Sequence, residues 1–280
     1  MNMNNLVFLK LGGSLITDKT QPYTPRLDKL AQIAIEIKSA LSAASQLHLI
    51  LGHGSGSFGH YAVKEQSNLL NQSPFSLGDR VEIEGTYWKG FSEVWFQASQ
   101  LNRLVIEALN KADIPAIAFP PSALVSAEDG TIKHWDLTTL HSALKAGLIP
   151  VIYGDIVFDE VRGGVVLSTE TLLFHLAQQL PVKHVLLAGL EAGVWADFPT
   201  RIQPVREITP ATFNTIAGMV GASDGMDVTG GMRSKVEEML RLVQLIPSLH
   251  VQIFSGEDDG NIKKTLDGEQ LGTLIASNDQ

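Results

Sequence analysis

Two glycine-rich stretches of the sequence lie beside lysines and could bind phosphate. The first runs from Lys10 to Ser14 (KLGGS) and is followed by Lys19, and the second is HGSGSFGH at residues 53–60. Because glycine lacks a Cβ, a ligand can lie against successive main-chain N–H groups, which together attract an anion. Lysine is ordinarily a surface residue, but Lys10 stands between two leucines, where a charge is costly without an anionic partner. These residues therefore predict a phosphate-binding site.

A third stretch, DVTGGMRSK at residues 227–235, combines a helix start with another lysine. Gly230 and Gly231 precede an apolar pattern with helical spacing, so we expect Lys235 about one turn inside a helix. The N–H groups at a helix N-terminus favour negative charge. Lys10, Lys19 and Lys235 could therefore meet at one point, although they come from distant parts of the chain.

Other ligand-binding patterns do not occur in the sequence. There is no Walker A pattern, GxxxxGK[ST], anywhere in the sequence. The histidines outside that stretch have no metal-ligand spacing, so we expect no metal held by side chains; they are His48, His134, His141, His175, His184 and His250. We expect His53 to hold its loop in place.

Short apolar runs bounded by glycine or proline predict the strands of a buried parallel sheet. They are Leu6–Leu11, Leu47–Leu51, Ile114–Phe119, Ile149–Tyr153, Val185–Ala188 and Val251–Phe254. Between several of them, apolar residues recur at spacings of three and four, as from Leu27 to Leu41 and from Met232 to Val243. This pattern predicts helices on both faces of the sheet and an α/β fold class. Ligands bind at the carboxyl ends of such strands, where the glycine-rich loops begin.

The composition is that of an ordinary globular chain and excludes several functions. The chain has 280 residues and a formal net charge of −9. We expect no nucleic-acid partner, because binding that polyanion requires spread lysines and arginines. The absence of cysteine excludes disulfides and thiolate metal sites. No apolar run reaches the roughly 18 residues of a membrane span and the N-terminus has no signal-peptide pattern, so we expect a cytoplasmic protein without a membrane partner.

The motifs resemble those of the amino acid kinase superfamily and, within it, the isopentenyl phosphate kinases. The similarity covers nearly the whole chain: KLGGSLITDK (10–19), HGSGSFGH (53–60), GDIVFDE (154–160), STE (168–170), AGLEAGVW (188–195) and DVTGGMRSK (227–235). It implies a single domain over residues 1–280, a three-layer αβα sandwich around a mainly parallel sheet. Approximately, residues 1–165 would form a substrate-binding lobe and residues 166–280 a nucleotide-binding lobe. The resemblance also implies ATP and Mg²⁺ as cofactors and a homodimer.

The same resemblance implies roles for individual residues. Five side chains would act in catalysis: Lys10, Lys19, His60, Glu170 and Lys235. The nucleotide would be bound by Lys10, Leu11, Gly12, Gly13, Ser14, Gly56, Gly189, Gly230 and Lys235. The acceptor would contact Ser55, Gly59, His60, Gly154 and Asp155. His60 would donate to the acceptor phosphate, and Lys235 would hold the transferring phosphoryl group.

Three departures from the family pattern concern this site. Thr169 and Glu170 replace the glycine and aspartate of the family's SGD motif, whose aspartate orients the active-site lysines. Glu170 thus keeps the carboxylate on a side chain that is one methylene longer. Ser55 replaces a glycine, which suits a contact through its main-chain N–H, and Ala192 replaces an aspartate near the base or ribose. These changes affect nucleotide preference and rate more than the fold.

Several residues keep two interpretations. Glu170 could be an ordinary first-turn acid stabilised by the helix dipole, and Asp155 could cap a turn rather than touch the acceptor. Five aromatic residues share a predicted helix: Tyr87, Trp88, Phe91, Trp95 and Phe96. These side chains, Tyr87 and Phe91 in particular, could line a pocket for a five-carbon chain, or they could belong to the core or to a dimer interface.

The resemblance implies ATP-dependent phosphorylation of isopentenyl phosphate to isopentenyl diphosphate. Such an acceptor is already ionised near neutral pH, so the chemistry depends on bringing two polyanions together rather than on a strong base. Two alternatives stay open. One is a kinase of the same fold for another small phosphate, phosphonate or carboxylate, and the other is a non-catalytic nucleotide or metabolite sensor.

Overall fold

The computed structural model describes residues 5–44, 46–67, 85–197, 199–217 and 231–278. Within these residues the main sheet has eight strands in the order β12-β14-β13-β9-β1-β2-β6-β3. In that order they are Glu207–Ile208, Thr273–Ile275, His250–Ser255, Val182–Gly189, Leu6–Leu11, His48–His53, Ile149–Tyr153 and Ala116–Ala118. Neighbouring strands are parallel except β13 and β14. The prediction of a mainly parallel sheet is confirmed.

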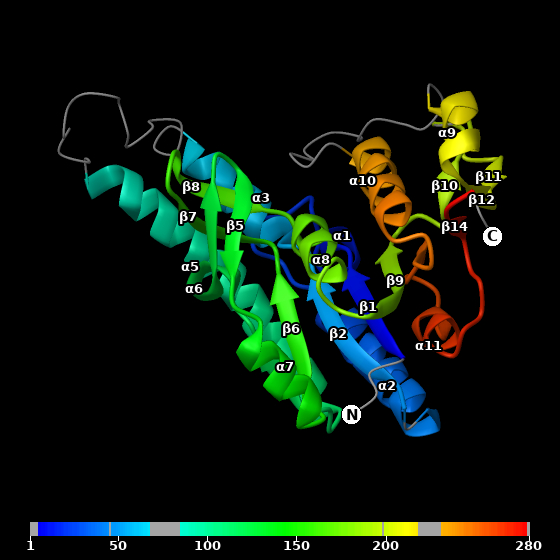
Figure 1. Ribbon diagram of the computed structural model, residues 1–280. Helices are drawn as coiled ribbons and strands as arrows, with labels where there is room; N and C mark the ends of the chain where they lie inside the picture. Colours follow the sequence, from blue (N-terminus) through cyan, green and yellow to red (C-terminus); the bar gives the residue numbers. More distant parts are fainter. Residues whose placement is uncertain (1–4, 45, 68–84, 198, 218–230, 279–280) are drawn as a thin grey trace.

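Helices cover both faces of this sheet, which gives the three-layer sandwich that the resemblance implies (Figure 1). One face packs against α2 (Leu27–Ala43), α5 (Gly85–Lys111) and α11 (Asn261–Leu266). The other packs against α7 (Thr138–Lys145), α8 (Thr169–Ala177) and α10 (Gly231–Leu245). Alternation along β1 explains both layers, because odd-numbered residues from Val7 contact the first set while Leu6 and Phe8 contact the second.

Shorter elements surround the carboxyl ends of the central strands. Two helices directly follow β1 and β2, namely α1 (Gly13–Ile16) and α3 (Gly56–Glu65). A second sheet, ordered β5-β4-β7-β8, contains Thr131–Trp135, Val125–Glu128, Asp155–Asp159 and Gly163–Leu167. The remaining elements are α6 (Pro121–Leu124), α9 (Pro210–Ile216) and the pair β10 (Val194–Trp195) and β11 (Pro204–Val205). None of the helices in the described ranges combines the length and apolar composition of a membrane span.

The apolar runs locate the strands well and their ends less well. Leu6–Leu11 and Ile149–Tyr153 match β1 and β6 residue for residue. The run at Ile114–Phe119 shortens to three residues in β3, where a proline on each side has no N–H to donate to a neighbouring strand. The run Leu47–Leu51 shifts to His48–His53, so β2 carries Gly52 and His53 into the sheet.

Candidate active site

A cavity of about 740 Å³ opens at the carboxyl ends of β1, β2, β6 and β9. Its lining includes most of the predicted site residues: Lys10, Gly12, Gly13, Ser14, Lys19, Ser55, Gly56, Gly59, His60, Gly154, Asp155, Glu170, Gly189 and Lys235. The Leu11 side chain lies in the apolar core instead. Gly230 lies outside the described residues. Tyr87 and Phe91 are described but do not line this cavity.

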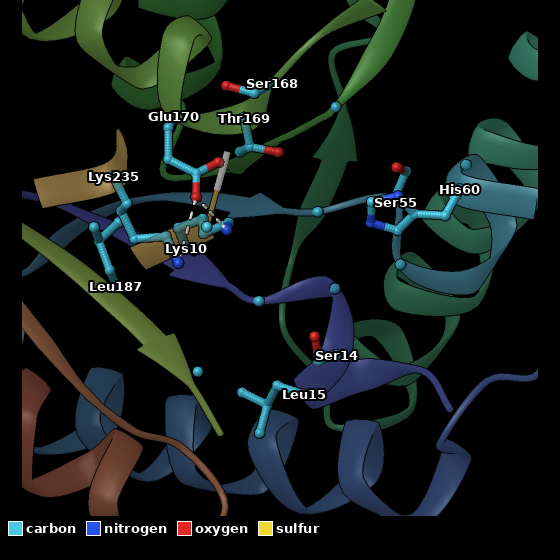
Figure 2. A pocket seen from close by; sticks show the side chains of 18 of the residues that line it. Lys10, Ser14, Leu15, Ser55, His60, Ser168, Thr169, Glu170, Leu187 and Lys235 are labelled. Carbon is cyan, nitrogen blue, oxygen red and sulfur yellow. Dashed lines mark hydrogen bonds and ion pairs between the residues drawn. The ribbon is translucent and has the colours of Figure 1, made fainter. Parts of the chain in front are cut away.

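Lys10 is the penultimate residue of β1, and strand alternation decides where its side chain lies. Leu9 and Leu11 belong to the core on the α2 side, so Lys10 points to the opposite side, where α8 and α10 pack. The Lys10 Nζ lies 2.6 Å from Glu170 Oε1, and the Lys235 Nζ lies 4.0 Å from the same oxygen. Figure 2 shows the three side chains converging from three elements. Two of the three lysines predicted to meet therefore share one carboxylate.

Glu170 is a nearly buried carboxylate, with 14% of its side chain exposed. Burial alone would raise the pKa of this carboxyl, but the charges of Lys10 and Lys235 and the Lys10 hydrogen bond outweigh it and lower the pKa to about 2. Glu170 is therefore ionised at neutral pH and orients both ammonium groups while neutralising the charge of only one. An ordinary first-turn acid interacts mainly with the helix dipole, whereas Glu170 also contacts the ammonium groups of Lys10 and Lys235.

The glycine-rich loops after β1 and β2 pack against each other through their backbones. A Cβ added at Gly13 would lie 2.6 Å from the main chain of Gly56, and one at Gly54 would lie 2.9 Å from the Gly13 nitrogen. Gly56 has a φ of +52°, which side chains rarely allow. The missing side chains therefore serve contact between the loops as well as access for a ligand, a requirement that the sequence analysis did not identify.

Thr17 joins the same two loops and was not singled out from the sequence. Its Oγ1 donates to the Gly13 carbonyl at 2.7 Å and accepts from the Ser57 N–H at 2.9 Å. Only 1% of Thr17 is exposed. One buried hydroxyl thus connects the turn of α1 to the first turn of α3. No sequence pattern marks it, because both partners are main-chain groups.

Ser55 caps the start of α3, His60 lies just over one turn inside it, and both line the cavity with Gly56 and Gly59. A Cβ at Gly59 would collide with the Ser55 hydroxyl, so glycine is required one turn after Ser55. The positive end of a helix dipole and its main-chain N–H groups favour an anion at this place. In Figure 2, Ser55 and His60 lie across the cavity from Lys10, Glu170 and Lys235. The cavity therefore has cationic or donor groups on two sides.

His53 holds its loop, as the sequence analysis predicts. The side chain is fully buried, its Nε2 lies 3.2 Å from Asn102 Oδ1, and its ring stacks on Tyr153. Burial lowers the pKa of His53 to about 4, so the ring is neutral at physiological pH. Asn102 was not identified from the sequence, since it lies on the distant helix α5.

Asp155 is 1% exposed, and both of its carboxylate oxygens accept main-chain N–H groups. Oδ1 accepts from Ile156 at 2.9 Å, and Oδ2 accepts from Ser122 at 3.2 Å. Burial raises the pKa of Asp155 to about 6 despite these bonds. Asp155 thus ties α6 to the start of β7, and it also lines the cavity beside Gly154.

One part of the cavity wall, contributed by α3, α5 and β8, is aliphatic. Tyr87 and Phe91 turn towards the β7–β8 hairpin, where the Tyr87 hydroxyl donates to the Arg162 carbonyl and the Phe91 ring stacks on Phe158. An aromatic floor made by these two side chains is therefore replaced by four small apolar residues: Val63, Val94, Ala98 and Val166. Val94 and Ala98 follow Phe91 by three and seven positions on the same face of α5, so the difference comes from position along the helix axis. Phe91 meets the hairpin, and the next two turns of the same face reach the cavity.

The other end of the cavity contains charged residues that the sequence analysis missed. Glu191 stands beside the departure at Ala192 and accepts from the Trp195 indole at 2.7 Å and from Arg201 Nε at 3.1 Å. All three of these side chains line the cavity. Glu238 on α10 lines it too, and burial together with the nearby Glu170 raises the pKa of Glu238. Although Ala192 has no carboxylate, the adjacent residue Glu191 supplies one to this end of the cavity.

Comparison with known proteins identifies the class to which this fold and site belong. The sequence profile of the amino acid kinase family matches residues 5–255, and the chain belongs to this family. Among curated relatives, isopentenyl phosphate kinase of Methanocaldococcus jannaschii is 34% identical over 96% of this chain and 98% of its own length. Isopentenyl phosphate kinase of Methanothermobacter thermautotrophicus is 33% identical over the same shares.

Solved structures agree with this assignment. The structure described as "X-ray structures of isopentenyl phosphate kinase" superposes with a TM-score of 0.78 at 30% identity, covering 97% of this chain and 100% of that one. An isopentenyl phosphate kinase substrate complex superposes with a TM-score of 0.72 at 24% identity, covering 97% of this chain and 99% of that one, and supports the fold alone. The predicted fold class and family are both confirmed.

Proposed function

We propose that this chain is an ATP-dependent phosphotransferase that converts isopentenyl phosphate to isopentenyl diphosphate. The observation that carries the proposal is one cavity in which the Lys10–Glu170–Lys235 group faces the start of α3 and the wall includes an aliphatic part. Cationic and aliphatic surfaces in one cavity match an acceptor with a phosphate head and a five-carbon tail. Relatives of 33% and 34% identity carry the name of this activity.

The reaction is an in-line phosphoryl transfer. An oxygen of the acceptor phosphate forms a bond to the γ-phosphorus of ATP while the bond from that phosphorus to the β–γ bridging oxygen breaks, which releases ADP. Most acceptor molecules are already ionised at neutral pH, because the second pKa of a phosphate monoester is about 6. The chain therefore needs no strong base, and its task is to hold two polyanions in contact.

The lining residues divide between the two substrates. The nucleotide phosphates would lie against Gly12, Gly13, Ser14, Gly56 and Gly189, and the acceptor against Ser55, Gly59, His60, Gly154 and Asp155. Lys10 and Lys235 would neutralise the transferring phosphoryl group, with Glu170 holding both ammonium groups. Lys19, which also lines the cavity, would add positive charge beside them. All five acceptor residues lie within the proposed substrate-binding half, residues 1–165, whereas the nucleotide residues come from both halves of the chain.

Magnesium would enter with ATP. Mg²⁺ keeps much of its water and is usually bound through substrate phosphates rather than by an all-protein cage. When bound, it would neutralise phosphate charge that the lysines leave uncompensated. At constant ATP concentration, the rate of turnover should therefore rise as Mg²⁺ is added.

The homodimer is likewise a proposal. Two large apolar side chains, Leu27 (56% exposed) and Ile35 (66% exposed), border a groove between α2 and α5 and could form part of a subunit interface. Multi-angle light scattering of the purified chain gives the mass directly. A monomer at micromolar concentration would contradict this proposal and leave the catalytic one intact.

The acceptor is tested by ADP release with a panel of compounds. We use isopentenyl phosphate, isovalerate as the five-carbon carboxylate, and methylphosphonate as a small polar acceptor. The specificity constant kcat/KM should favour isopentenyl phosphate by at least about 100-fold, since binding the tail contributes to the transition state. Preferred turnover of the carboxylate or the phosphonate would identify a different kinase of the same fold. Calorimetric ATP binding without transfer to any compound would identify a sensor.

A further inference from the structure

Thr169 makes a buried contact between two loops of the site that are far apart in sequence. Its Oγ1 donates to the main-chain carbonyl of His53 at 2.6 Å, across 116 positions of sequence. Thr169 is 1% exposed and His53 is fully buried. Thr169 is also the first residue of α8 and the immediate neighbour of Glu170. The contact therefore connects the end of β2 to the turn that carries the lysine-binding carboxylate.

The His53 end of this contact is held firmly. The His53 ring nitrogens lie 3.2 Å from Asn102 Oδ1 and 3.1 Å from the Gly54 carbonyl oxygen, and the ring stacks on Tyr153. Its main-chain carbonyl also accepts the Gly154 N–H at 3.2 Å. A buried carbonyl with two donors stays satisfied when one of them is removed, so loss of the Thr169 hydroxyl need not unfold the chain.

The methyl group of Thr169 lies in the same layer as the Lys10 stem. Lys10 pairs with Gly52 across β1 and β2. A Cβ added at Gly52 would lie 2.8 Å from Thr169 Cγ2 and 3.7 Å from Lys10 Cγ. Glycine at position 52 thus makes room for both side chains over one strand. Thr169 consequently borders the path along which Lys10 reaches Glu170.

We propose that Thr169 is a positioning residue: its bond to the His53 carbonyl fixes the first turn of α8 so that Glu170 holds Lys10 in the cavity. The N-cap bond from the Thr171 N–H to Ser168 Oγ, at 3.0 Å, orders this turn internally but does not tie it to the sheet. The Thr169 bond supplies that tie. This proposal rests on the proposed kinase function for its activity measurements and on Lys10 reactivity for an independent one.

The test compares Thr169→Val, which removes the hydroxyl and keeps the shape, with Thr169→Ser, which keeps the hydroxyl. We expect kcat with isopentenyl phosphate to fall about tenfold or more in T169V, because small misplacements of catalytic groups are costly, with KM for ATP changed less than about twofold. T169S should restore most of kcat. Thr265→Val, another buried threonine whose hydroxyl donates to a main-chain carbonyl in α11, should leave turnover unchanged.

A double-mutant cycle separates positioning from a general structural role. If Thr169 acts through Glu170, T169V in an E170Q background should lower kcat by less than about twofold. An equal loss of kcat in both backgrounds, or no loss in T169V alone, would overturn the proposal. The urea midpoint of each variant reports whether it folds.

Labelling of Lys10 by an amine-reactive reagent, measured by peptide mass spectrometry, needs no turnover. T169V should accelerate labelling of Lys10 relative to exposed lysines, whereas T265V should not. Unchanged Lys10 labelling in folded T169V would also overturn the proposal. If the wild-type chain fails to phosphorylate isopentenyl phosphate, the proposed function fails, and the labelling result still decides the role of Thr169.

Discussion

The ammonium group of Lys10 lies 2.6 Å from the carboxylate of Glu170, although 160 positions separate the two residues. Both side chains are largely removed from solvent, at 9% and 14% exposed. Removing one partner of such a pair leaves a charge with poor solvation. The pair therefore links stability and catalysis at the same place, and it can be tested for both.

Glu170→Gln keeps the shape of the side chain and removes its charge. We expect turnover to fall about 100-fold because the lysines lose their common anchor. The free energy of unfolding should fall by about 3 kcal/mol, as for other buried pairs that lose one partner. Urea denaturation and steady-state kinetics measure the two effects. Glu237→Gln, which breaks only a surface pair with Arg233, should change little, and an E170Q protein as active and stable as E237Q would refute the role of Glu170.

Lys235→Ala should separate chemistry from binding. Lys235 shares the Glu170 carboxylate at 4.0 Å and lines the cavity. If it acts mainly on the transferring phosphoryl group, kcat should fall about 100-fold or more while the ATP dissociation constant rises only a few-fold. Lys145→Ala, at an exposed position of α7, is the matched control. Equal losses of turnover and ATP affinity in K235A would contradict the assigned role.

Val166→Asp tests the aliphatic part of the cavity. Val166 lines the cavity and is 44% exposed, so an aspartate can be accommodated without overpacking the core. A carboxylate beside the tail and near the acceptor phosphate should raise KM for isopentenyl phosphate about tenfold or more and leave KM for ATP almost unchanged. Val161→Asp changes an equally exposed valine, 49% exposed, that does not line the cavity. The same KM increase in both variants would show that the effect is not local.

The buried histidine predicts a loss of stability in mild acid. Burial lowers the pKa of His53 from the ordinary 6.5 to about 4, so between these values the unfolded chain binds a proton that the folded chain does not. The contribution of His53 to the free energy of unfolding is complete above pH 6.5. It falls as the pH decreases, by about 2 kcal/mol between pH 7 and pH 5.

Asp155, whose pKa is raised to about 6 by burial, acts in the opposite direction over the same range. Comparing His53→Gln with wild type by urea denaturation at both pH values therefore isolates the histidine. The variant should lose less stability on acidification than wild type. Identical acid slopes for the two proteins would mean that His53 does not remain neutral in the folded state.

Much of the site could be predicted because its parts lie at positions with a simple geometric rule. Lys10 is the clearest example, since strand alternation alone sends it to the side opposite the leucines that flank it. Glycine-rich turns after β1 and β2 mark the sheet edge where the cavity opens. The position of Lys235 near the start of α10 followed from helical spacing in the same way.

The contacts that could not be predicted involve main-chain groups, which leave no signature in the sequence. Thr17 and Thr169 bond to main-chain groups 40 and 116 positions away, respectively, and any residue could supply those groups. For Tyr87 and Phe91 of α5 the buried positions favour the core alternative over the pocket, for another reason. Helical spacing groups residues on one face, but which neighbour that face meets depends on the β7–β8 hairpin, so Phe91 packs on Phe158 and Val94 reaches the cavity.

If this cavity joins ATP and isopentenyl phosphate for phosphoryl transfer, ³¹P nuclear magnetic resonance will follow the reaction directly. The purified chain is incubated with ATP, Mg²⁺ and isopentenyl phosphate. Two coupled diphosphate resonances should grow as the monophosphate resonance declines, with one ADP formed for each diphosphate. Release of ADP with inorganic phosphate, or an unchanged monophosphate resonance while ATP remains bound, would contradict the proposed function.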